Sequence, residues 1–355
     1  MGIQAGDITD LVNSTLKDLG RNKITDIATD LTSYVAADKL LQKSKVTFGG
    51  GIGYQYNLLN EDDGNARNAG LFAVDNINQV DGTLTGTVPW RHLTTGMAVE
   101  KRQMSMNLNT NAQVVNFVKE KRYQRIIAWV KLLEANFWDG PTSSSDTDTP
   151  FGLLNYWLDY DASTGFNGGN HTNFSGGPGG VDTGTYTDYK HYTFNFTAVS
   201  KTDAVRKMRA AFVKTGFKGI PGTKPISDYK TGNAMGIYTT YDNLYQLEEI
   251  LESQNDNLGN DIASKDGMTM FRRVPVEYVP YLETNHATSD PIIGINWGCL
   301  KTACLSGEWM RETPFAPAPN QHNTLVSHLD TSMNFVCEDR RAGIWLGAKS
   351  DPMSD

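Results

Sequence analysis

The sequence has few cysteines and no long hydrophobic run. Its 355 residues include only three cysteines, Cys299, Cys304 and Cys337, an odd number without the spacing of a metal site. We therefore expect buried, reduced thiols rather than a disulfide framework. No apolar stretch approaches the roughly 20 residues that a membrane span needs. The opening MGIQAGDITD has no basic segment followed by an apolar one, which predicts a chain without a secretory signal.

An excess of positive charge is also absent. Lys and Arg together number 32 against 40 Asp and Glu, for a net charge of −8. A protein that grips nucleic acid through clustered cations is therefore not expected, although one that merely encloses it is compatible with this charge. Hydrophobic residues make up 39% of the chain, enough for a packed core.

Catalytic signatures are missing as well. GGGIG at 49–53 is followed by extended sequence rather than a helix, so it predicts a flexible loop base and not a phosphate loop. The six histidines form no i, i+4 pair, and no Gly-x-Ser-x-Gly elbow occurs. Asp159–Ser163 resembles the start of a calcium loop, but Thr164 replaces the required Gly and Asn170 the required Glu. We expect no enzyme, no cofactor and no metal site.

The clearest element that is present is a long helix predicted at 112–138. At about 1.5 Å per residue it would form a strut roughly 40 Å long. Its apolar stripe is predicted to contain Val115, Val118, Ile126, Trp129, Leu133 and Phe137, with Arg122 filling the gap. Two short amphipathic helices within 7–42 have stripes that are thin for their length, so they need a surface to lie against.

Residues 46–100 predict a long two-stranded excursion with the polar tip EDDGNARNAG. A ribbon of this kind is marginal alone in water and needs a partner surface. Residues 141–198, rich in Gly, Thr, Asp and Tyr, predict a surface insertion. Further helices are predicted from Ser200 and from Tyr241, with strands between and after them, which indicates an α+β fold.

The order of these pieces resembles the major capsid proteins of tailed double-stranded DNA bacteriophages. VPWRHLTTGMAVEKRQMSMN with the helix after it resembles that family's loop exit and spine helix. TPFGLLNYW resembles the segment after the spine, GIYTTYDNLYQLEEIL and RRVPVEYVPYL the axial domain, and SMNFVCEDRRAGIWLG the closing strand. The resemblance implies the Hong Kong 97-like fold, which encapsulins and the herpesvirus capsid floor share.

The resemblance also implies a division into domains. It places an N-terminal arm at 1–45, an extended loop at 46–100, and a peripheral domain at 101–235 that contains the spine helix 112–138 and the insertion 141–198. An axial domain would follow at 236–321, and a returning peripheral strand with the C-terminus at 322–355.

The implied function is structural: self-assembly through hexamers and pentamers into an icosahedral head that encloses double-stranded DNA, made in the host cytoplasm and located in the virion. Decoration and separate scaffolding proteins are possible partners, and no membrane is involved. Predicted contacts between subunits are Trp90, Arg91, Glu100, Lys101, Arg102, Arg122 and Arg125. No lysine lies between Lys45 and Lys101, so covalent welding through a lysine of the loop, known in some members, is not expected.

Two other functions remain open at this point. A surface protein could use the Thr-, Tyr- and Gly-rich insertion to bind carbohydrate or to adhere. A cation-dependent hydrolase could use Asp159 and Asp161. Triangulation number, host, N-terminal processing and the particular salt bridges between subunits cannot be predicted from the sequence.

Overall fold

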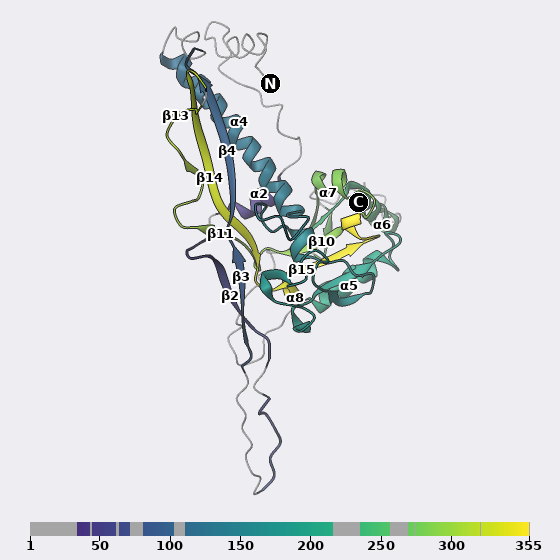
Figure 1. Ribbon diagram of the computed structural model, residues 1–355. Helices are drawn as coiled ribbons and strands as arrows, with labels where there is room; N and C mark the ends of the chain where they lie inside the picture. Colours follow the sequence, from purple (N-terminus) through teal and green to yellow (C-terminus); the bar gives the residue numbers. More distant parts are fainter. Residues whose placement is uncertain are drawn as a thin grey trace.

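The computed structural model describes residues 34–42, 45–61, 64–71, 81–102, 111–215, 235–255, 269–272, 274–319 and 321–354. Three parts are visible in Figure 1: a long limb, a thin ribbon that projects beyond the limb, and a rounded body beside their junction. Helices and sheets are combined in one chain, which confirms the α+β class. Among the described helices, none has the length and apolar character needed to cross a bilayer.

The limb is built on one 14-residue strand, β14 (Thr324–Cys337). Strand β4 (Arg91–Glu100) runs antiparallel to it over ten residue pairs. Three further strands pair with β14: β11 (Leu300–Leu305), β12 (Arg311–Glu312) and β13 (Ala316–Pro317). The last strand of the sheet, β1 (Val46–Gly49), is parallel to β11. Residues far apart in the sequence therefore form one narrow sheet along the limb.

Helix α4 (Asn111–Trp138) lies along this sheet, as Figure 1 shows, and confirms the long helix predicted from periodicity. Its predicted stripe is correct at Trp129, Leu133 and Phe137, which are buried. It is wrong at Ile126, which is 41% exposed. Arg125, rather than Arg122, occupies the buried position one turn before Trp129, because the row runs in steps of four residues.

The short helix α2 (Val35–Leu40) is fastened to α4 by a buried carboxylate. Glu134 accepts hydrogen bonds from the backbone N–H groups of Ala36 (3.2 Å) and Ala37 (2.9 Å) and from the Trp138 indole (2.8 Å). Burial raises the pKa of Glu134, while these three donors lower it. The remainder of the predicted arm, 1–33, lies outside the described residues.

The ribbon is shorter than predicted. The ribbon spans residues 53–89, and its paired strands are β2 (Gly53–Leu59) and β3 (Thr83–Pro89), antiparallel from Gly53↔Pro89 to Leu59↔Thr83. The two ends of the predicted excursion, β1 and β4, belong to the limb sheet instead. Strand-like sequence continues without a break through Trp90, so the change of partner is not visible in the pattern.

The body contains a seven-stranded mixed sheet in the order β5-β6-β15-β10-β7-β9-β8. Its strands are β5 (Gly165–Gly168), β6 (His191–Asn195), β7 (Met235–Thr239), β8 (Met270–Phe271), β9 (Val274–Tyr278), β10 (Ile292–Asn296) and β15 (Ile344–Ala348). Alternate residues of its strands face different cores. Ile292 and Trp345 pack in the core that contains α5 (Ala204–Lys214) and α6 (Tyr241–Asn255). Ile293 and Leu346 pack in the core that contains α4. Helices α7 (Pro280–Asn285) and α8 (Arg340–Gly343) complete the body.

The expectation that 141–198 is a surface insertion is wrong for much of its length. Its π-helical turn η2 (Leu153–Trp157) is buried throughout, and β6 supplies Tyr192 and Phe194 to a core. Strand β6 is also parallel to β15 within the body sheet. The many turn residues connect short buried pieces, and the average composition of the segment conceals their aromatic side chains.

The predicted domain boundaries do not coincide with the division between the two sheets. Strands β11 to β13 fall inside the predicted axial range 236–321 but belong to the limb. Strand β15 falls in the predicted peripheral range 322–355 but lies in the middle of the body sheet. The chain passes repeatedly between limb and body, and long-range strand pairing of this kind leaves no local signal.

Candidate functional site

Ribbon, limb and body meet at a junction where short connections and buried side chains come together. Residues 50–52 connect β1 to β2, and a single residue, Trp90, connects β3 to β4. The Trp90 indole N–H donates to the carbonyl of Gly51 (2.9 Å), which ties the two connections together. Gly51 has φ +82, a conformation that favours glycine, and a Cβ on Gly49 would make a tight contact of 3.2 Å with the Trp90 ring. The predicted flexible base at 49–53 is thus the turn at the root of the ribbon.

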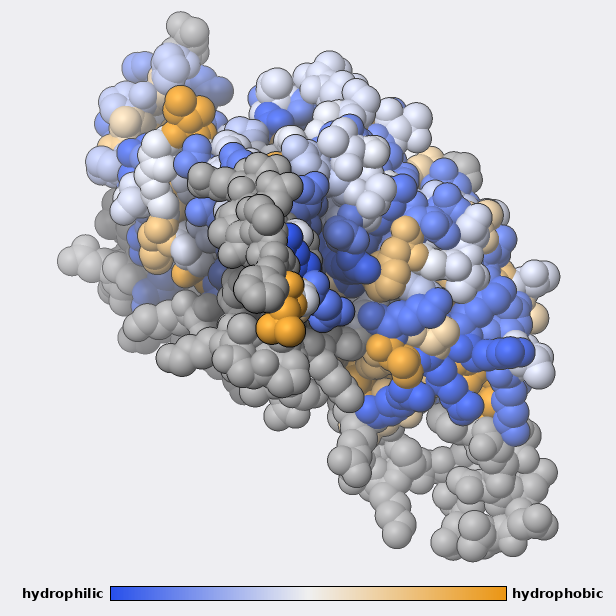
Figure 2. Space-filling view, turned by 90° about the horizontal axis from the view of Figure 1, so that it is seen from below, coloured by the Kyte–Doolittle hydropathy of each residue, from blue (hydrophilic) through white to orange (hydrophobic). Residues whose placement is uncertain are grey.

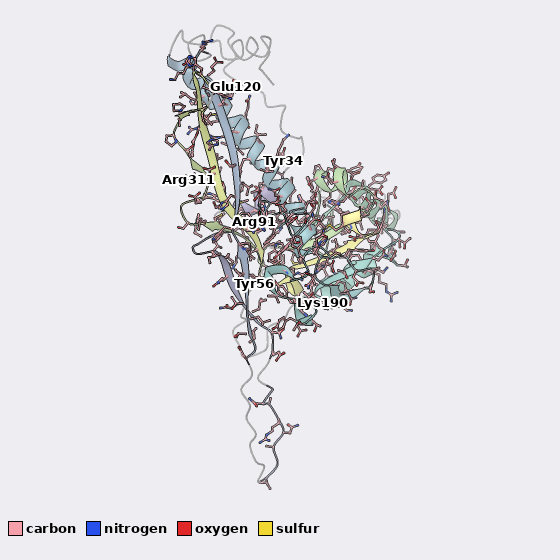
Figure 3. The ribbon with its side chains drawn as sticks, viewed as in Figure 1. Tyr34, Tyr56, Arg91, Glu120, Lys190 and Arg311 are labelled. Carbon is pink, nitrogen blue, oxygen red and sulfur yellow. The ribbon has the colours of Figure 1, made fainter. Side chains whose placement is uncertain are left out.

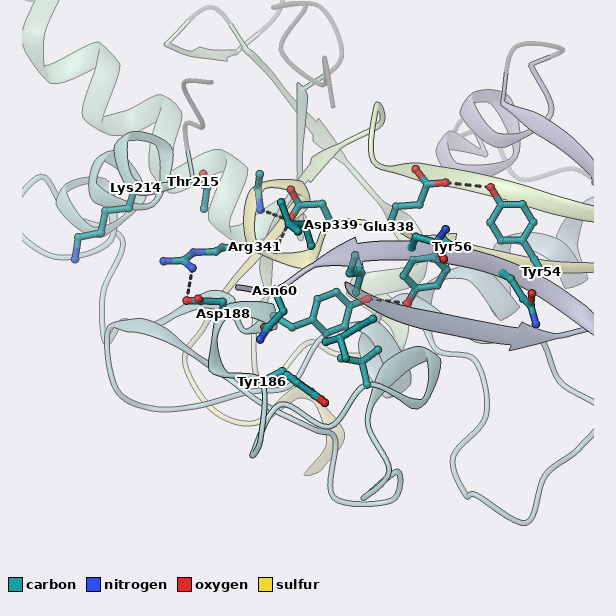
Figure 4. Close-up of a pocket in the computed structure, with 18 residues that line it drawn as sticks. Tyr54, Tyr56, Asn60, Tyr186, Asp188, Lys214, Thr215, Glu338, Asp339 and Arg341 are labelled. Atoms are coloured by element: carbon teal, nitrogen blue, oxygen red, sulfur yellow. Dashed lines mark hydrogen bonds and ion pairs between the residues drawn. The ribbon is translucent and has the colours of Figure 1, made fainter. Parts of the chain in front are cut away.

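Two tyrosines on one face of β2 fasten this root to the rest of the chain. Tyr54 donates its hydroxyl to Oε1 of Glu338 (3.1 Å), and Lys301 pairs with the same carboxylate (2.9 Å). Burial, with the negative charge of Glu338, raises the pKa of Tyr54 to about 12, so the hydroxyl remains a donor. Figure 4 shows this bond at the end of β14.

The second tyrosine, Tyr56, is buried and packs across the ribbon on Gly86, where an added Cβ would lie 2.4 Å from its ring. Its hydroxyl lies 2.8 Å from the hydroxyl of Tyr189, which in turn donates to the carbonyl of Cys337 (3.3 Å). A Cβ on Gly179 would lie 2.3 Å from the Tyr56 hydroxyl, so only glycine leaves room there. Figure 3 shows Tyr56 where the ribbon leaves the molecule.

A groove of about 640 Å³ opens beside these tyrosines. Strand β2 forms one wall, and residues 181–189, 214–215 and 338–342 form the others (Figure 4). Arg341 pairs with Asp188 (2.5 Å) across it. Among the described residues, no group of three or more His, Cys, Asp or Glu side chains is placed to hold a metal ion.

The ribbon exposes large apolar side chains. Ile52 at its root is 94% exposed and Leu71 beyond the paired strands is 95% exposed, with Leu59 also exposed between them. Elsewhere the surface seen from below is mostly hydrophilic, with hydrophobic residues scattered singly (Figure 2). Isolated apolar residues are ordinary on a globular surface, but these three follow one another along a thin projection, where the part of the chain that the structure describes does not cover them.

The predicted contact residues fall into three separate places. Trp90 and Arg91 lie at the root, where the Arg91 guanidinium stands 5.0 Å from the centre of the Phe151 ring. Arg122 and Arg125 on α4 both pair with Glu312 of β12, Arg125 at 2.6 Å with its side chain only 4% exposed. These two arginines therefore hold the helix to the limb sheet of the same chain.

The remaining three, Glu100, Lys101 and Arg102, lie at the other end of β4, about 33 Å from the root at about 3.3 Å per residue. Lys101 donates its backbone N–H to the carbonyl of Asn323 (2.9 Å), and the side chains of Lys101 and Arg102 are exposed. A contact between subunits at any of the seven positions stays a prediction.

A buried cation joins the C-terminal segment to 157–191. The Arg340 side chain is fully buried and donates to the carbonyls of Trp157 (2.8 Å) and Gly169 (2.9 Å) and to Nδ1 of His191 (3.0 Å). Burial, and then the positive charge of Arg340, hold the pKa of His191 well below its usual value. The arrangement stabilises the packing, since Nε and Nη2 of the guanidinium both donate to the chain itself.

The two carboxylates of the calcium-like segment are also engaged by the backbone. Asp159 accepts the N–H of Gly169 (3.0 Å), and Asp161 accepts the N–H of Ser163 (2.7 Å). Burial raises the pKa of Asp159 to about 6, against the smaller opposing effects of that hydrogen bond and Arg340. The three cysteines are free and buried, as expected.

Sequence reasoning missed the residues that fix the root. The i, i+2 spacing of Tyr54 and Tyr56 is a signal that both lie on one face of a strand. Gly86 opposite Tyr56 in the ribbon is a second signal, because an aromatic residue commonly covers a strand glycine. Glu312, which holds both spine arginines, has no local signal, since it lies 187 residues beyond Arg125.

Comparisons with known proteins show the fold. No protein-family model matches the sequence, and no curated protein does. A chain of the cyanophage A-1(L) capsid is similar in structure, with 14% identity and a TM-score of 0.59 over 94% of this chain and 98% of that one. A capsid chain of Myoviridae phage XM1 has 11% identity and a TM-score of 0.57 over 94% and 98% of the two chains.

The SrpI encapsulin complex of Synechococcus elongatus PCC 7942 contains a chain with 9% identity and a TM-score of 0.51, over 99% of this chain and 97% of that one. These matches extend over limb, ribbon and body together. The chain therefore has the Hong Kong 97-like fold of phage capsid proteins and encapsulins, as its sequence resemblance implied.

Proposed function

We propose that this chain is the major capsid protein of a tailed double-stranded DNA bacteriophage and that it assembles into an icosahedral shell. The single observation that carries the proposal is the ribbon, which extends away from the body with Ile52 and Leu71 almost fully exposed. A two-stranded ribbon is marginally stable at best in water. Contact with other copies would supply the burial that one chain lacks.

The limb offers a surface that could receive such a ribbon. On α4, Tyr123 is 54% exposed and Ile126 is 41% exposed, and the two are neighbours on the helix at i, i+3. In this proposal the limb is the peripheral domain and the seven-stranded sheet with α5 to α7 is the axial domain. Contacts of the ribbon with a neighbouring limb, repeated around each capsomer, would build hexamers and pentamers.

The shell would enclose double-stranded DNA without reading its sequence. The net charge of −8 suits a wall that does not grip its contents. Decoration proteins and a separate scaffolding protein are proposed as further partners, and the virion as the location. The role is structural, without an enzymatic step.

The two alternative functions have less support. For a hydrolase, the carboxylates of Asp159 and Asp161 would have to leave the backbone N–H groups that they now accept. For a carbohydrate-binding surface, the aromatic residues of 141–198 would have to be exposed, but Phe151, Tyr156 and Trp157 are buried in a core.

The test is the assembly state of the purified chain, measured by light scattering and electron microscopy over a range of salt and protein concentrations. Closed shells of uniform size are expected. A chain that remains monomeric under every condition contradicts the proposal. A melting shift on adding sugars would then favour the carbohydrate-binding alternative, and metal-dependent turnover the hydrolase.

A further inference from the structure

The root of the ribbon combines a pivot and a fastening. The pivot consists of residues 50–52 on one side and Trp90 on the other, so two short connections carry the whole ribbon. Two of the three residues at 50–52 are glycines, the residue with the least resistance to rotation about its backbone bonds. Left to these connections, the ribbon could swing relative to the limb.

The fastening consists of the hydroxyl groups of Tyr54 and Tyr56. Both bind at the C-terminal end of β14. Tyr54 donates to the side chain of Glu338, the residue after the strand, and Tyr56 is linked through Tyr189 to the carbonyl of Cys337, the last residue of the strand. Two attachment points on one strand resist rotation, whereas one point would allow it. Tyr56 is also held between Gly86 of the ribbon and Gly179 of the body.

We propose that Tyr54 and Tyr56 form a clamp that fixes the direction of the ribbon in the unassembled chain, and so act as positioning residues for assembly. This inference rests on the proposed function for its consequence, but the clamp itself is a property of the single chain. A segment already held in its binding direction loses less conformational freedom when it binds, so contact with the next copy is tighter.

The clamp predicts a difference between removing hydroxyls and removing rings. Tyr54→Phe and Tyr56→Phe keep the packing of both rings and delete only the two hydrogen bonds, so the core should remain intact. Gly179→Ala acts from the opposite side, because its Cβ would lie 2.3 Å from the Tyr56 hydroxyl and its φ is +69. Tyr245→Phe is the matched control, since Tyr245 is exposed on α6, away from the ribbon.

The direction of the ribbon is measured by electron–electron double resonance on the full chain, below the concentration at which it assembles. Spin labels are attached to Thr87→Cys on β3 of the ribbon and Lys201→Cys beside α5, both at exposed positions. The natural cysteines do not interfere, because all three are buried and burial raises the pKa of Cys304 to about 12.

A narrow distance distribution is expected for the natural tyrosines and for Tyr245→Phe, and a broad or shifted one for the double Tyr54→Phe, Tyr56→Phe variant and for Gly179→Ala. The threshold concentration for assembly should rise roughly tenfold in the double variant, the effect of losing two ordinary hydrogen bonds. Circular dichroism checks that each variant is folded.

Identical distance distributions in the double variant and its parent would overturn the clamp. A broadened distribution with an unchanged assembly threshold would overturn its positioning role. A parent chain that forms no shells at all, yet shows the expected broadening in the variants, contradicts the proposed function and leaves the clamp standing. The two failures are thus distinguishable.

Discussion

At the scale of single residues, the fold depends on a few buried polar side chains that no local pattern identifies. Arg340 is the clearest, because its guanidinium donates to two carbonyls and a histidine that lie 149 to 183 residues earlier. Its neighbour Arg341, half exposed and paired with Asp188, has the same chemistry in a solvated place. The sequence alone shows two adjacent arginines and does not indicate which of them is buried.

Arg340→Ala should lower the free energy of unfolding by about 3–5 kcal/mol, because it leaves a cavity and removes the donor from two carbonyls and from His191. Urea denaturation followed by tryptophan fluorescence measures this effect. Arg341→Ala is the matched control and should cost no more than about 1 kcal/mol, as exposed ion pairs do. Equal costs for the two substitutions would contradict the structural role assigned to Arg340.

Asp159 gives a prediction about pH. Because its pKa is raised to about 6 in the folded chain, the unfolded chain loses the proton first as pH rises from about 4. Stability due to this group therefore falls between about pH 4 and pH 6 and is constant above. Asp159→Asn keeps an oxygen to accept the Gly169 N–H and removes the cost of the buried charge.

The Asn variant should accordingly be more stable than the natural chain by about 1–2 kcal/mol at pH 7, after allowing for partial exposure, and equal to it near pH 4. Chemical denaturation at both pH values provides the comparison. A variant that is less stable at pH 7 would show that the charge is needed where it lies.

At the scale of elements, periodicity predicts what is local. The helix α4 was predictable to within one residue of its start, since its apolar residues recur over seven turns. The error at Ile126 arose because Arg125, a charged residue, occupies a core position through its contacts with Glu312 and Ser327. Burial of this kind depends on the strand that faces the helix, which lies far along the sequence.

Strand partners were beyond prediction for the same reason. Residues 46–100 predict one excursion, yet among the described residues of this range only the strands 53–59 and 83–89 pair with each other. The exchange of partners occurs at Trp90, where the ribbon ends and the limb begins. The buried character of 141–198 was missed because glycine and asparagine turns outnumber the aromatic residues that they connect.

The ribbon can be tested as an element. Its strands are still paired where Asn60 donates to the carbonyl of Gly82 (2.8 Å), and no described residue between 60 and 82 belongs to a core. Replacing residues 60–82 with Asn-Gly, a two-residue turn that suits an antiparallel ribbon, should keep the body and limb folded. The free energy of unfolding should change by less than about 1 kcal/mol.

The same replacement should abolish shell formation, because it removes Leu71 and shortens the reach of the ribbon to its neighbour. Electron microscopy of the shortened chain measures this outcome. A version in which residues 64–70 are replaced by an equally long Gly-Ser segment is the matched control for length. Shells of normal size from the shortened chain would show that the ribbon is dispensable.

At the scale of the whole molecule, the proposed array gives the exposed ribbon a surface to lie against. Body and limb have their own cores, whereas the ribbon extends from a clamped root with its apolar residues uncovered. The overall arrangement was predictable from the order of elements, although few of the residues that align them were. Similarity over nearly the full length to phage capsid and encapsulin chains shows that the order of the elements corresponds to a known fold.

The most direct measurement is a cryo-electron microscopy reconstruction of particles formed by the purified chain. It should show the ribbon of each subunit lying across another copy, with the side chains of Ile52 and Leu71 covered by that copy. A ribbon folded back over its own body, or a preparation that contains only monomers at every salt and protein concentration, would contradict the account.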